Sequence, residues 1–284
     1  MTTSTLPIST NSQVQTLSLA RYALDAPVLP LVTDTLPVAE AVRTALMGRY
    51  QRLLHQRKFG HAEKPYQEQF RSPTLAGKDA DGQPLRDHRH AYFLPVDEDR
   101  DGRLDHVVVF APAGYSADEV QALGRLRSLR LGETELRVML VVLGQPADFN
   151  TPLFAPAAVW TSATPFVVTR FPKLRGQKKD RPEDRATPQL FAAHVLRQEL
   201  DRLRARRPDL PPVVAVDLQD GIGPQRLRPI QFARFRNKTS DDGARRPAAA
   251  LRITFAQPTP GPLALGHSAH FGLGLFLPAP EAPA

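Results

Sequence analysis

The stretch around which this chain is organised is Gly261-Pro-Leu-Ala-Leu-Gly-His-Ser-Ala-His-Phe-Gly-Leu-Gly-Leu-Phe276. A loop bounded by glycines leads into an apolar strand over residues 271–277 that itself carries Gly272 and Gly274. Glycine weakens the interior of a strand, so it often marks a bulge or the close approach of a ligand or another backbone. Glycine-rich loops also present backbone N–H groups to phosphate oxygens. The pattern therefore suggests a phosphate-rich partner, and the alternative is an ordinary Gly-Pro turn before a C-terminal strand.

The charge of the chain favours an anionic partner. Lys and Arg number 37 against 29 Asp and Glu, giving a net charge of +8, which is typical of proteins that bind nucleic acid or a membrane surface. No apolar run approaches the roughly 18 residues of a membrane span, and the first residues do not resemble a signal peptide. The lack of cysteine excludes disulfides, thiolate metal sites and cysteine nucleophiles. We therefore expect a cytoplasmic protein without a cofactor or a membrane partner.

Hydrophobic periodicity predicts a first unit over residues 16–150, after a flexible leader at residues 1–15. The predicted order is strand, helix, strand, strand, helix, strand, which is the ferredoxin-like unit. A capping-box pattern begins the second helix at Ser116, and Gly132 can end it. The elements lie at residues 17–31, 33–55, 88–94, 104–110, 116–132 and 136–143, the last as a buried strand.

A second unit over residues 158–278 repeats this order after a proline-containing linker at 144–157. Its strands are predicted at residues 159–168, 213–216, 230–236, 251–255 and 271–277, with a helix that begins at Thr187-Pro188. A second helix is missing, because the glycine-rich stretch occupies much of its position. The predicted fold class is α+β, with two tandem ferredoxin-like domains of the RRM or RAMP kind and a C-terminal glycine-rich loop.

Five motifs, in this order, resemble the CRISPR type I-G (formerly I-U) repeat-processing protein of the RAMP superfamily, over about residues 16–278. That protein is often fused to a backbone-capping subunit, and we expect this half to be separate or missing here. The motifs are Gly77-Lys-Asp-Ala-Asp-Gly-x-Pro-Leu85, His88-x-His-Ala-Tyr92, Asp97-x-Asp-x-Asp-Gly-x-Leu-Asp-His106, Thr164-Pro-Phe-Val167 with Lys173, and Phe271-Gly-Leu-Gly-Leu-Phe276.

The resemblance implies metal-independent cleavage of the CRISPR repeat in precursor RNA to give mature crRNA. The 2′-hydroxyl attacks the adjacent phosphate and leaves a 2′,3′-cyclic phosphate and a 5′-hydroxyl. It also implies that the protein keeps its product and joins other CRISPR effector subunits. The alternatives are a non-catalytic crRNA-binding subunit and, unrelated to RNA, a calcium-stabilised scaffold.

This reaction needs an acid, a base and donors for the phosphorane charge. Histidine suits the first two roles because its ordinary pKa is about 6.5, and lysine suits the third. His88 and His90 are two residues apart on a predicted strand, so both point to one face beside Tyr92, and the loop with Lys78 precedes them. The alternative is a solvated sheet face. His106 on the next strand is either a third member or a structural residue.

Other histidines rank lower. His55 and His61 lie in and after the first helix, where related repeat endonucleases often carry a catalytic histidine, although a solvated basic helix end explains them equally. His194 lies beside apolar residues on a helix and is interpreted as a core or boundary residue.

Two basic segments are candidates for RNA contacts, which give affinity without sequence information when they go to phosphates. The alternative for each member is a solvated loop. The weaker segment interleaves Arg234 and Arg236 with Phe232 and Phe235. The stronger candidates are Arg170, Lys173, Arg175, Lys178 and Lys179, together with Gly261, Gly266, His267, His270, Gly272 and Gly274 of the glycine-rich stretch.

The turn between the predicted strands at 88–94 and 104–110 resembles a calcium loop. It has Asp97, Asp99, Asp101 and Asp105 at the first, third, fifth and ninth places. An EF-hand loop has a glutamate at the twelfth place, where this chain has Val108. A polar hairpin turn is therefore favoured over bound calcium.

Overall fold

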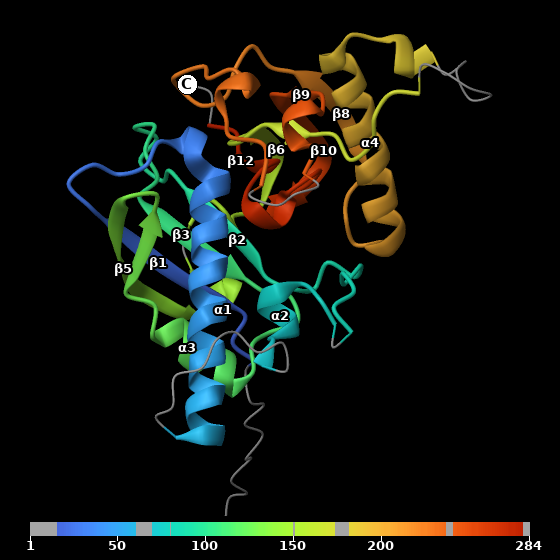
Figure 1. Ribbon diagram of the computed structural model, residues 1–284. Helices are drawn as coiled ribbons and strands as arrows, with labels where there is room; N and C mark the ends of the chain where they lie inside the picture. Colours follow the sequence, from blue (N-terminus) through green and yellow to red (C-terminus); the bar gives the residue numbers. More distant parts are fainter. Residues whose placement is uncertain are drawn as a thin grey trace, which may run out of the picture.

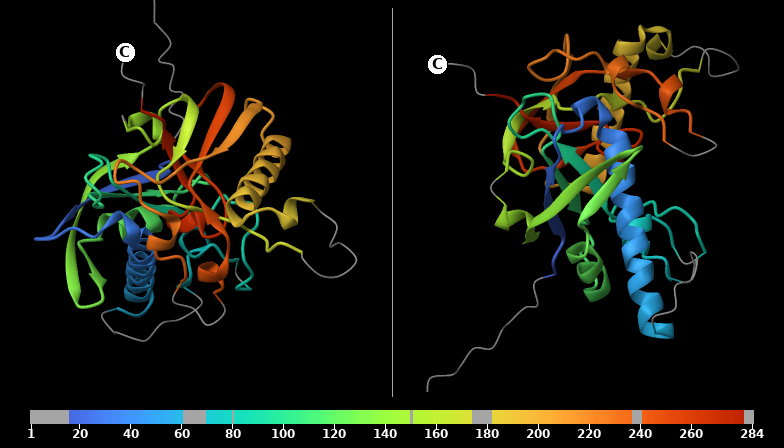
Figure 2. Two further views of the ribbon diagram at one scale, coloured as in Figure 1. Left: turned by 90° about the horizontal axis from the view of Figure 1, so that it is seen from above. Right: turned by 60° about the vertical axis from the view of Figure 1, so that its left-hand side comes forward.

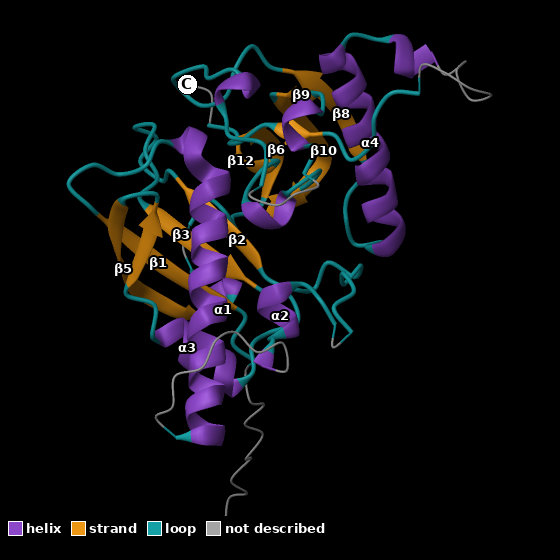
Figure 3. Cartoon of the chain, viewed as in Figure 1, coloured by secondary structure: helices purple, strands orange, loops and turns teal. Residues whose placement is uncertain are grey.

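The computed structural model describes residues 16–60, 70–79, 81–149, 151–173, 182–236 and 241–280. The predicted leader at 1–15 lies outside these residues. Within them the chain forms two five-stranded antiparallel sheets and a two-stranded one, with α1 beside the first sheet and α4 beside the second (Figures 1 and 3). None of the described helices is both long and apolar enough to cross a membrane.

The first sheet has the strand order β2-β3-β1-β5-β4. Without the added edge strand β4, this is the order of a ferredoxin-like unit. Helices α1 and α3 pack on the face that carries Tyr22, whose hydroxyl donates a hydrogen bond to the Leu123 carbonyl at 2.9 Å. The elements are β1 (Leu19–Asp25), α1 (Thr35–Phe59), α2 (Pro73–Ala76), β2 (Tyr92–Val96), β3 (His106–Phe110), α3 (Ala117–Gly124), β4 (Ser128–Leu131) and β5 (Thr134–Gly144).

The second sheet repeats the arrangement with the order β11-β12-β6-β10-β8. Phe191 and Leu200 of α4 pack against Trp160 and Ile253 of this sheet in a second core. The predicted α+β class with two ferredoxin-like units is therefore confirmed. The elements are β6 (Ala157–Ser162), β7 (Phe166–Val167), α4 (Pro188–Arg206), β8 (Val213–Leu218), β9 (Ala248–Ala249), β10 (Leu251–Thr259), β11 (Leu263–Ala264) and β12 (Leu275–Pro278), with β7 pairing to β9.

Capping residues begin two helices where the sequence predicted them. Ser116 forms a complete capping box with Glu119 at the start of α3. The hydroxyl of Thr187 accepts a hydrogen bond from the Leu190 amide at the start of α4. Each interaction satisfies an amide that the first helical turn leaves unpaired.

Several predicted boundaries in the first unit were wrong. His88 precedes β2 and has φ of 56°, so the His88–Tyr92 segment is a turn that enters the strand at Tyr92. α3 ends at Gly124, whereas Gly132, with φ of +61°, lies in the turn between β4 and β5. Strand β5 is not buried throughout, because its residues alternate between the core and solvent and Met139 is 62% exposed. Turns at His88 and Gly132, both with positive φ, interrupt the predicted elements at these two positions. In β5 only one face of the strand is buried, so its apolar residues do not all lie in the core.

The second unit also departs from prediction. Residues 230–236 form no strand, and a 3₁₀ turn, η5 (Pro229–Gln231), lies at their start. The predicted strand over 159–168 is divided between β6 and β7 by a bend. The missing second helix is confirmed: among the described residues between β10 and β12 there is only β11 and a 3₁₀ turn, η7 (Ala269–Phe271). The predicted strand at 271–277 therefore begins at Leu275.

The glycine-rich segment joins the two halves. Phe271 and Leu273 are part of the core of the first unit, and Gly272 lies so close to α1 that an added Cβ would be 2.7 Å from Cγ2 of Thr35. A further apolar cluster contains Leu94 from the first sheet, Leu275 from the second and Phe154 from the predicted linker. Figure 2 shows the sheets of both halves from two further directions. This packing places η7 against the start of β2.

Candidate active site

Three histidines and a tyrosine from distant parts of the sequence meet where η7 contacts β2. The ring of His270 stacks on those of His90 and Tyr92, with centroids 3.8 Å apart in both pairs. The His88 ring is 5.4 Å from the His270 ring. The structure thus brings together three of the predicted catalytic residues and adds His270, which the sequence had suggested only for RNA binding.

The hydrogen bonds of His270 determine its tautomer. Its Nδ1 is 3.2 Å from the Ala91 carbonyl oxygen, which can only accept, so Nδ1 carries the proton. Nε2 of the neutral ring is then an acceptor, and it lies 3.1 Å from Nδ1 of His88. His88 therefore donates from Nδ1, and its Nε2 is left as the basic atom. His88 is the exposed member of the cluster.

Burial keeps the cluster neutral. It lowers the pKa of His270 to about 3 and that of His90 to about 4, and the neighbouring histidines add to both effects. The pKa of His88 is lowered by burial and by Arg206. Burial raises the pKa of Tyr92 to about 12, so its hydroxyl keeps its proton. At pH 7 the cluster is an uncharged aromatic stack with one accessible base.

Lys78 and His106 lie outside this stack. Gly77 packs on the His90 ring, where an added Cβ would be 2.7 Å from Cδ2, and exposed Lys78 follows it. His106 pairs with Val96 in the β2–β3 ladder, whereas Tyr92 pairs with Phe110 at the other end. Its Nδ1 is 2.9 Å from Asp105. The structure does not bring His106 to the other candidates, and its Nδ1 also lies 3.6 Å from Glu98.

Two arginines lie over Phe271 of η7: Arg236, a member of the weaker basic patch, and Arg43, which the sequence analysis did not name. The guanidinium of Arg236 lies over the Phe271 ring at 3.8 Å and forms an ion pair with Glu40 of α1 at 2.8 Å. Arg43 lies over the same ring at 5.9 Å, and its charge acts on His90. No sequence spacing connects these residues, because they come from α1 and from the segment after η5.

The amide groups of the glycine-rich loop are used within the fold. Gly272 N–H donates to the Ala269 carbonyl and Gly274 N–H to the Pro165 carbonyl. Gly266 N–H donates to the carboxylate of Glu199 on α4, a residue whose pKa is raised by burial. Gly261 packs so that an added Cβ would be 2.0 Å from the Leu153 carbonyl oxygen. The glycines are required by close backbone packing, and these three amides do not form the phosphate cradle that their pattern suggested.

The predicted basic segment is described only in part. Arg170 forms an ion pair with Asp184 at 2.6 Å, where the Asp184 side chain is fully buried, and it lies over the Phe191 ring at 4.7 Å. The contact with Asp184 uses Nη1 of Arg170, and its predicted role in RNA binding stays a prediction. Lys173 is exposed. Arg175, Lys178 and Lys179 lie outside the described residues.

The weaker basic patch is divided between buried and exposed side chains. Arg234 donates to the carbonyl oxygens of Arg246 and Ala244. Phe232 is buried, whereas Phe235 is 63% exposed. The interleaved pattern therefore does not form one continuous surface for RNA.

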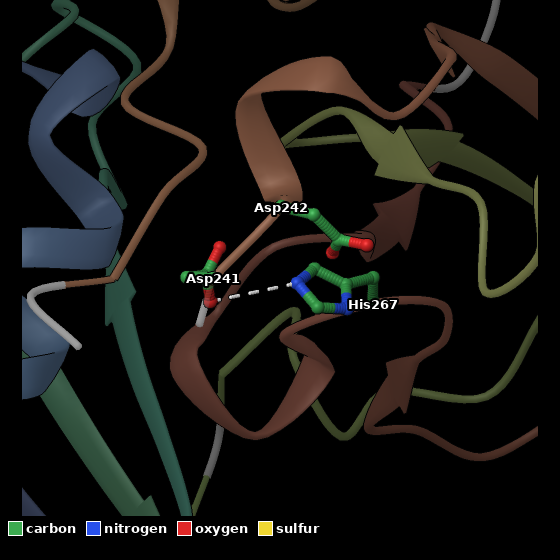
Figure 4. A group of neighbouring side chains, drawn as sticks. All are labelled: Asp241, Asp242 and His267. Atoms are coloured by element: carbon green, nitrogen blue, oxygen red, sulfur yellow. Dashed lines mark ion pairs between the residues drawn. The ribbon is translucent and has the colours of Figure 1, made fainter. Parts of the chain in front are cut away.

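His267 lies apart from the stack, beside two aspartates (Figure 4). Its Nε2 is 3.8 Å from Asp241, and possible ligand atoms of His267, Asp241 and Asp242 lie within 4.8 Å of one another. Arg246 forms a two-point ion pair with Asp242 at 2.7 and 2.9 Å. The His267 amide donates to the Val167 carbonyl. These contacts anchor the loop before η7.

The aspartate-rich turn satisfies its own backbone. Asp97 accepts a hydrogen bond from Gly102 N–H, Asp99 from Asp101 N–H, and Asp101 from Arg103 N–H. Asp105 accepts from the Glu98 amide. These contacts are those of a polar hairpin turn. Carboxylate oxygens of Asp97, Asp99 and Asp105 also lie within 4.8 Å of one another, so the choice between the hairpin turn and bound calcium stays a prediction.

The remaining histidines lie elsewhere. His55 is buried and packs against Phe59 and Phe70. His194 is half-buried within α4, and its Nε2 is 2.9 Å from Nε2 of Gln198. His61 lies outside the described residues.

Comparison with solved structures gives distant likenesses. A structure titled "Crystal structure of Cas6b" has a TM-score of 0.44 and 10% identity, covering 92% of this chain and 100% of that one. "Characterization of a Cas6-related gene from Pyrococcus furiosus" has a TM-score of 0.40 and 12% identity, covering 94% and 100%. "An RAMP protein binding different RNA substrates" has a TM-score of 0.39 and 13% identity, covering 93% and 99%. The sequence matches no protein-family model and no curated protein.

Proposed function

We propose that this protein is an endoribonuclease that binds CRISPR repeat RNA and cleaves it by general acid–base catalysis without a metal ion. The observation that supports the proposal is the stack of His88, His90, Tyr92 and His270, which leaves one imidazole accessible. The site carries the proposal, and the likeness to the solved structures does not, since their TM-scores are 0.44 or lower.

In this proposal His88 is the base. Nε2 of His270 accepts a hydrogen bond from Nδ1–H of His88. Nε2 of His88 is therefore free of a proton and can take the proton of the 2′-hydroxyl. The 2′-oxygen then bonds to phosphorus and the bond from phosphorus to the 5′-oxygen breaks. The same imidazole can return the proton to the 5′-oxygen, so the products are a 2′,3′-cyclic phosphate and a 5′-hydroxyl with no net proton change.

The other residues prepare this proton transfer. His270 fixes the orientation and tautomer of His88, while His90 and Tyr92 hold His270 by stacking. Arg206 and Arg43 supply positive charge beside the stack, which favours a phosphate at that position. Lys78 is within the adjacent loop and is proposed to stabilise charge on the phosphorane. A bound phosphate would raise the pKa of His88 and help it to hold the proton.

A non-catalytic crRNA-binding subunit is the second candidate, within a complex of other effector subunits. The observation that favours it is the low pKa of His90 and His270, which leaves these two rings neutral and unable to act as acids at pH 7. In that case the stack would serve as a rigid platform beside the RNA.

The decisive experiment incubates the protein in EDTA with its labelled CRISPR repeat and with a repeat that is 2′-deoxy at the cut site. We expect cleavage of the first substrate only. His88→Ala should lower the rate by roughly 10²–10⁴-fold, the range of general acid–base catalysis, with RNA binding retained. His194→Ala is the matched control and should cleave normally. Binding without cleavage of either substrate would favour the structural subunit.

A further inference from the structure

Four arginines gather where α1 meets the segment between α3 and β4. Arg49 and Arg52 are three residues apart on α1, so they lie on one side of the helix. The guanidinium of Arg49 donates hydrogen bonds to the carbonyl oxygens of Arg125 and Ser128, at 2.9 and 3.5 Å. Arg127 lies between these two residues in the sequence. We call Arg49, Arg52, Arg125 and Arg127 the arginine cluster.

The arginine cluster lacks acidic partners. None of its four members forms an ion pair with a described residue, whereas Arg57, further along α1, pairs with Asp118. Burial lowers the pKa of Arg49, and the positive charges of Arg52 and Arg127 lower it further. No carboxylate of a described residue is among the groups that act on Arg49. Repulsion between these guanidinium groups therefore destabilises the folded chain unless an anion binds there.

The arginine cluster is accessible to such an anion. Arg52, Arg125 and Arg127 are exposed, and half-buried Arg49 is held in place by its hydrogen bonds to the backbone. A guanidinium group carries five N–H donors in a planar fork that matches two phosphate oxygens, and it stays charged at neutral pH. Exposed, neighbouring guanidinium groups without carboxylates therefore suit phosphate groups.

The arginine cluster is separate from the histidine stack. Helix α1 contacts both β2 and β4, which are the two edge strands of the first sheet. Its Arg43 donates to the Ala76 carbonyl on the side of the histidine stack, whereas Arg49 reaches Ser128, the first residue of β4. With about 4.8 Å between neighbouring strands, the two edges are roughly 20 Å apart. A phosphate at the arginine cluster is therefore too far from His88 to be the one that is cleaved.

We propose that the arginine cluster binds the sugar–phosphate backbone of the RNA at a second position, remote from the cleavage site. The inference rests on the proposed function, because that function supplies the RNA. The net charge of +8 also favours a nucleic acid partner. Contacts to phosphates give affinity without sequence information. An acidic protein segment is the other polyanion of matching charge, and the test separates the two.

The test measures the affinity of the full chain for the repeat that is 2′-deoxy at the cut site, over a series of salt concentrations. The double variant Arg52→Gln with Arg125→Gln should reduce the slope of log K against log salt by about 0.7 for each lost contact with a single strand, or roughly 1.4 in total. Its free energy of unfolding in urea should be equal to that of the wild type or higher, because a repulsive charge is removed. The matched control is Arg226→Gln, an exposed arginine that is paired with Asp220, and it should keep the wild-type slope.

Two results would overturn the proposal. One is a salt slope in the double variant equal to that of the wild type. The other is saturable binding of polyglutamate that the double variant weakens while its RNA affinity is unchanged, which would assign the arginine cluster to a protein partner. Cleavage of the unmodified repeat at saturating RNA is measured in parallel and should be equal in the wild type and the double variant. A reduced slope without cleavage by either protein would refute the nuclease activity alone, so the two proposals fail separately.

Discussion

The glycine-rich segment offers a direct test of why its glycines are present. Gly274 has φ of +62°, and a Cβ added to it would be 1.8 Å from the carbonyl oxygen of Leu265. We predict that Gly274→Ala destabilises the protein, because alanine is strained at positive φ and the obstructing atom belongs to the backbone. The turn cannot relieve the contact by rotating a side chain.

The expected loss combines two effects. An unfavourable left-handed conformation costs alanine about 1–2 kcal/mol, and the displacement of tightly packed backbone adds roughly 1–3 kcal/mol, as overpacking does. The sum is about 2–5 kcal/mol. At roughly 2–4 °C for each kcal/mol in a chain of this class, the melting temperature should fall by about 4–20 °C.

The matched control is Gly48→Ala, the same change in the middle of α1. Gly48 is exposed, and nothing lies within 4 Å of a Cβ added there. Alanine is better than glycine in a helix by about 1 kcal/mol, so this variant should be more stable than the wild type. Both are compared by urea unfolding and thermal melting. A Gly274→Ala protein as stable as the wild type would refute the interpretation of the segment as a closely packed turn.

Three further predictions follow from named contacts. Burial lowers the pKa of His90 and His270 in the folded protein, so below about pH 6.5 the unfolded chain binds more protons than the folded chain does. The free energy of unfolding, measured by urea titration, should therefore be highest above pH 6.5 and should fall as the pH is lowered toward 4. His270→Phe should make this fall smaller. Glu199→Ala should cost about 1–3 kcal/mol because the Gly266 amide loses its hydrogen bond to a charged group, and Glu199→Gln should cost less; equal losses would contradict this role. Arg170→Ala should lower the free energy of unfolding by about 3–5 kcal/mol, because it removes the cationic partner of the fully buried Asp184 carboxylate. Lys173→Ala should leave stability unchanged and weaken RNA binding at low salt, and the reverse pattern would refute the assignment.

Several features could be predicted from the sequence because they depend on local chemistry. The helix starts at Ser116 and Thr187 follow from hydroxyls that cap the first amides. The order of the core strands and helices of the first half follows from hydrophobic periodicity. The same holds in the second half for β6, α4, β8, β10 and β12, although the predicted strand at 230–236 does not form. The grouping of His88 with His90 and Tyr92 came from their short spacing, although the reason given, a shared strand face, was wrong.

Other features were decided only by the tertiary structure, because they join residues that are distant in sequence. His270 meets His88 across 182 residues, and Arg236 meets Glu40 across 196. The burial that keeps His270 neutral exists only where η7 packs on β2. The sequence by itself determined which residues could act as acids, bases or turns. Packing between the two halves determined which of them meet and which donors and charges remain accessible, because proximity and burial are properties of the folded chain.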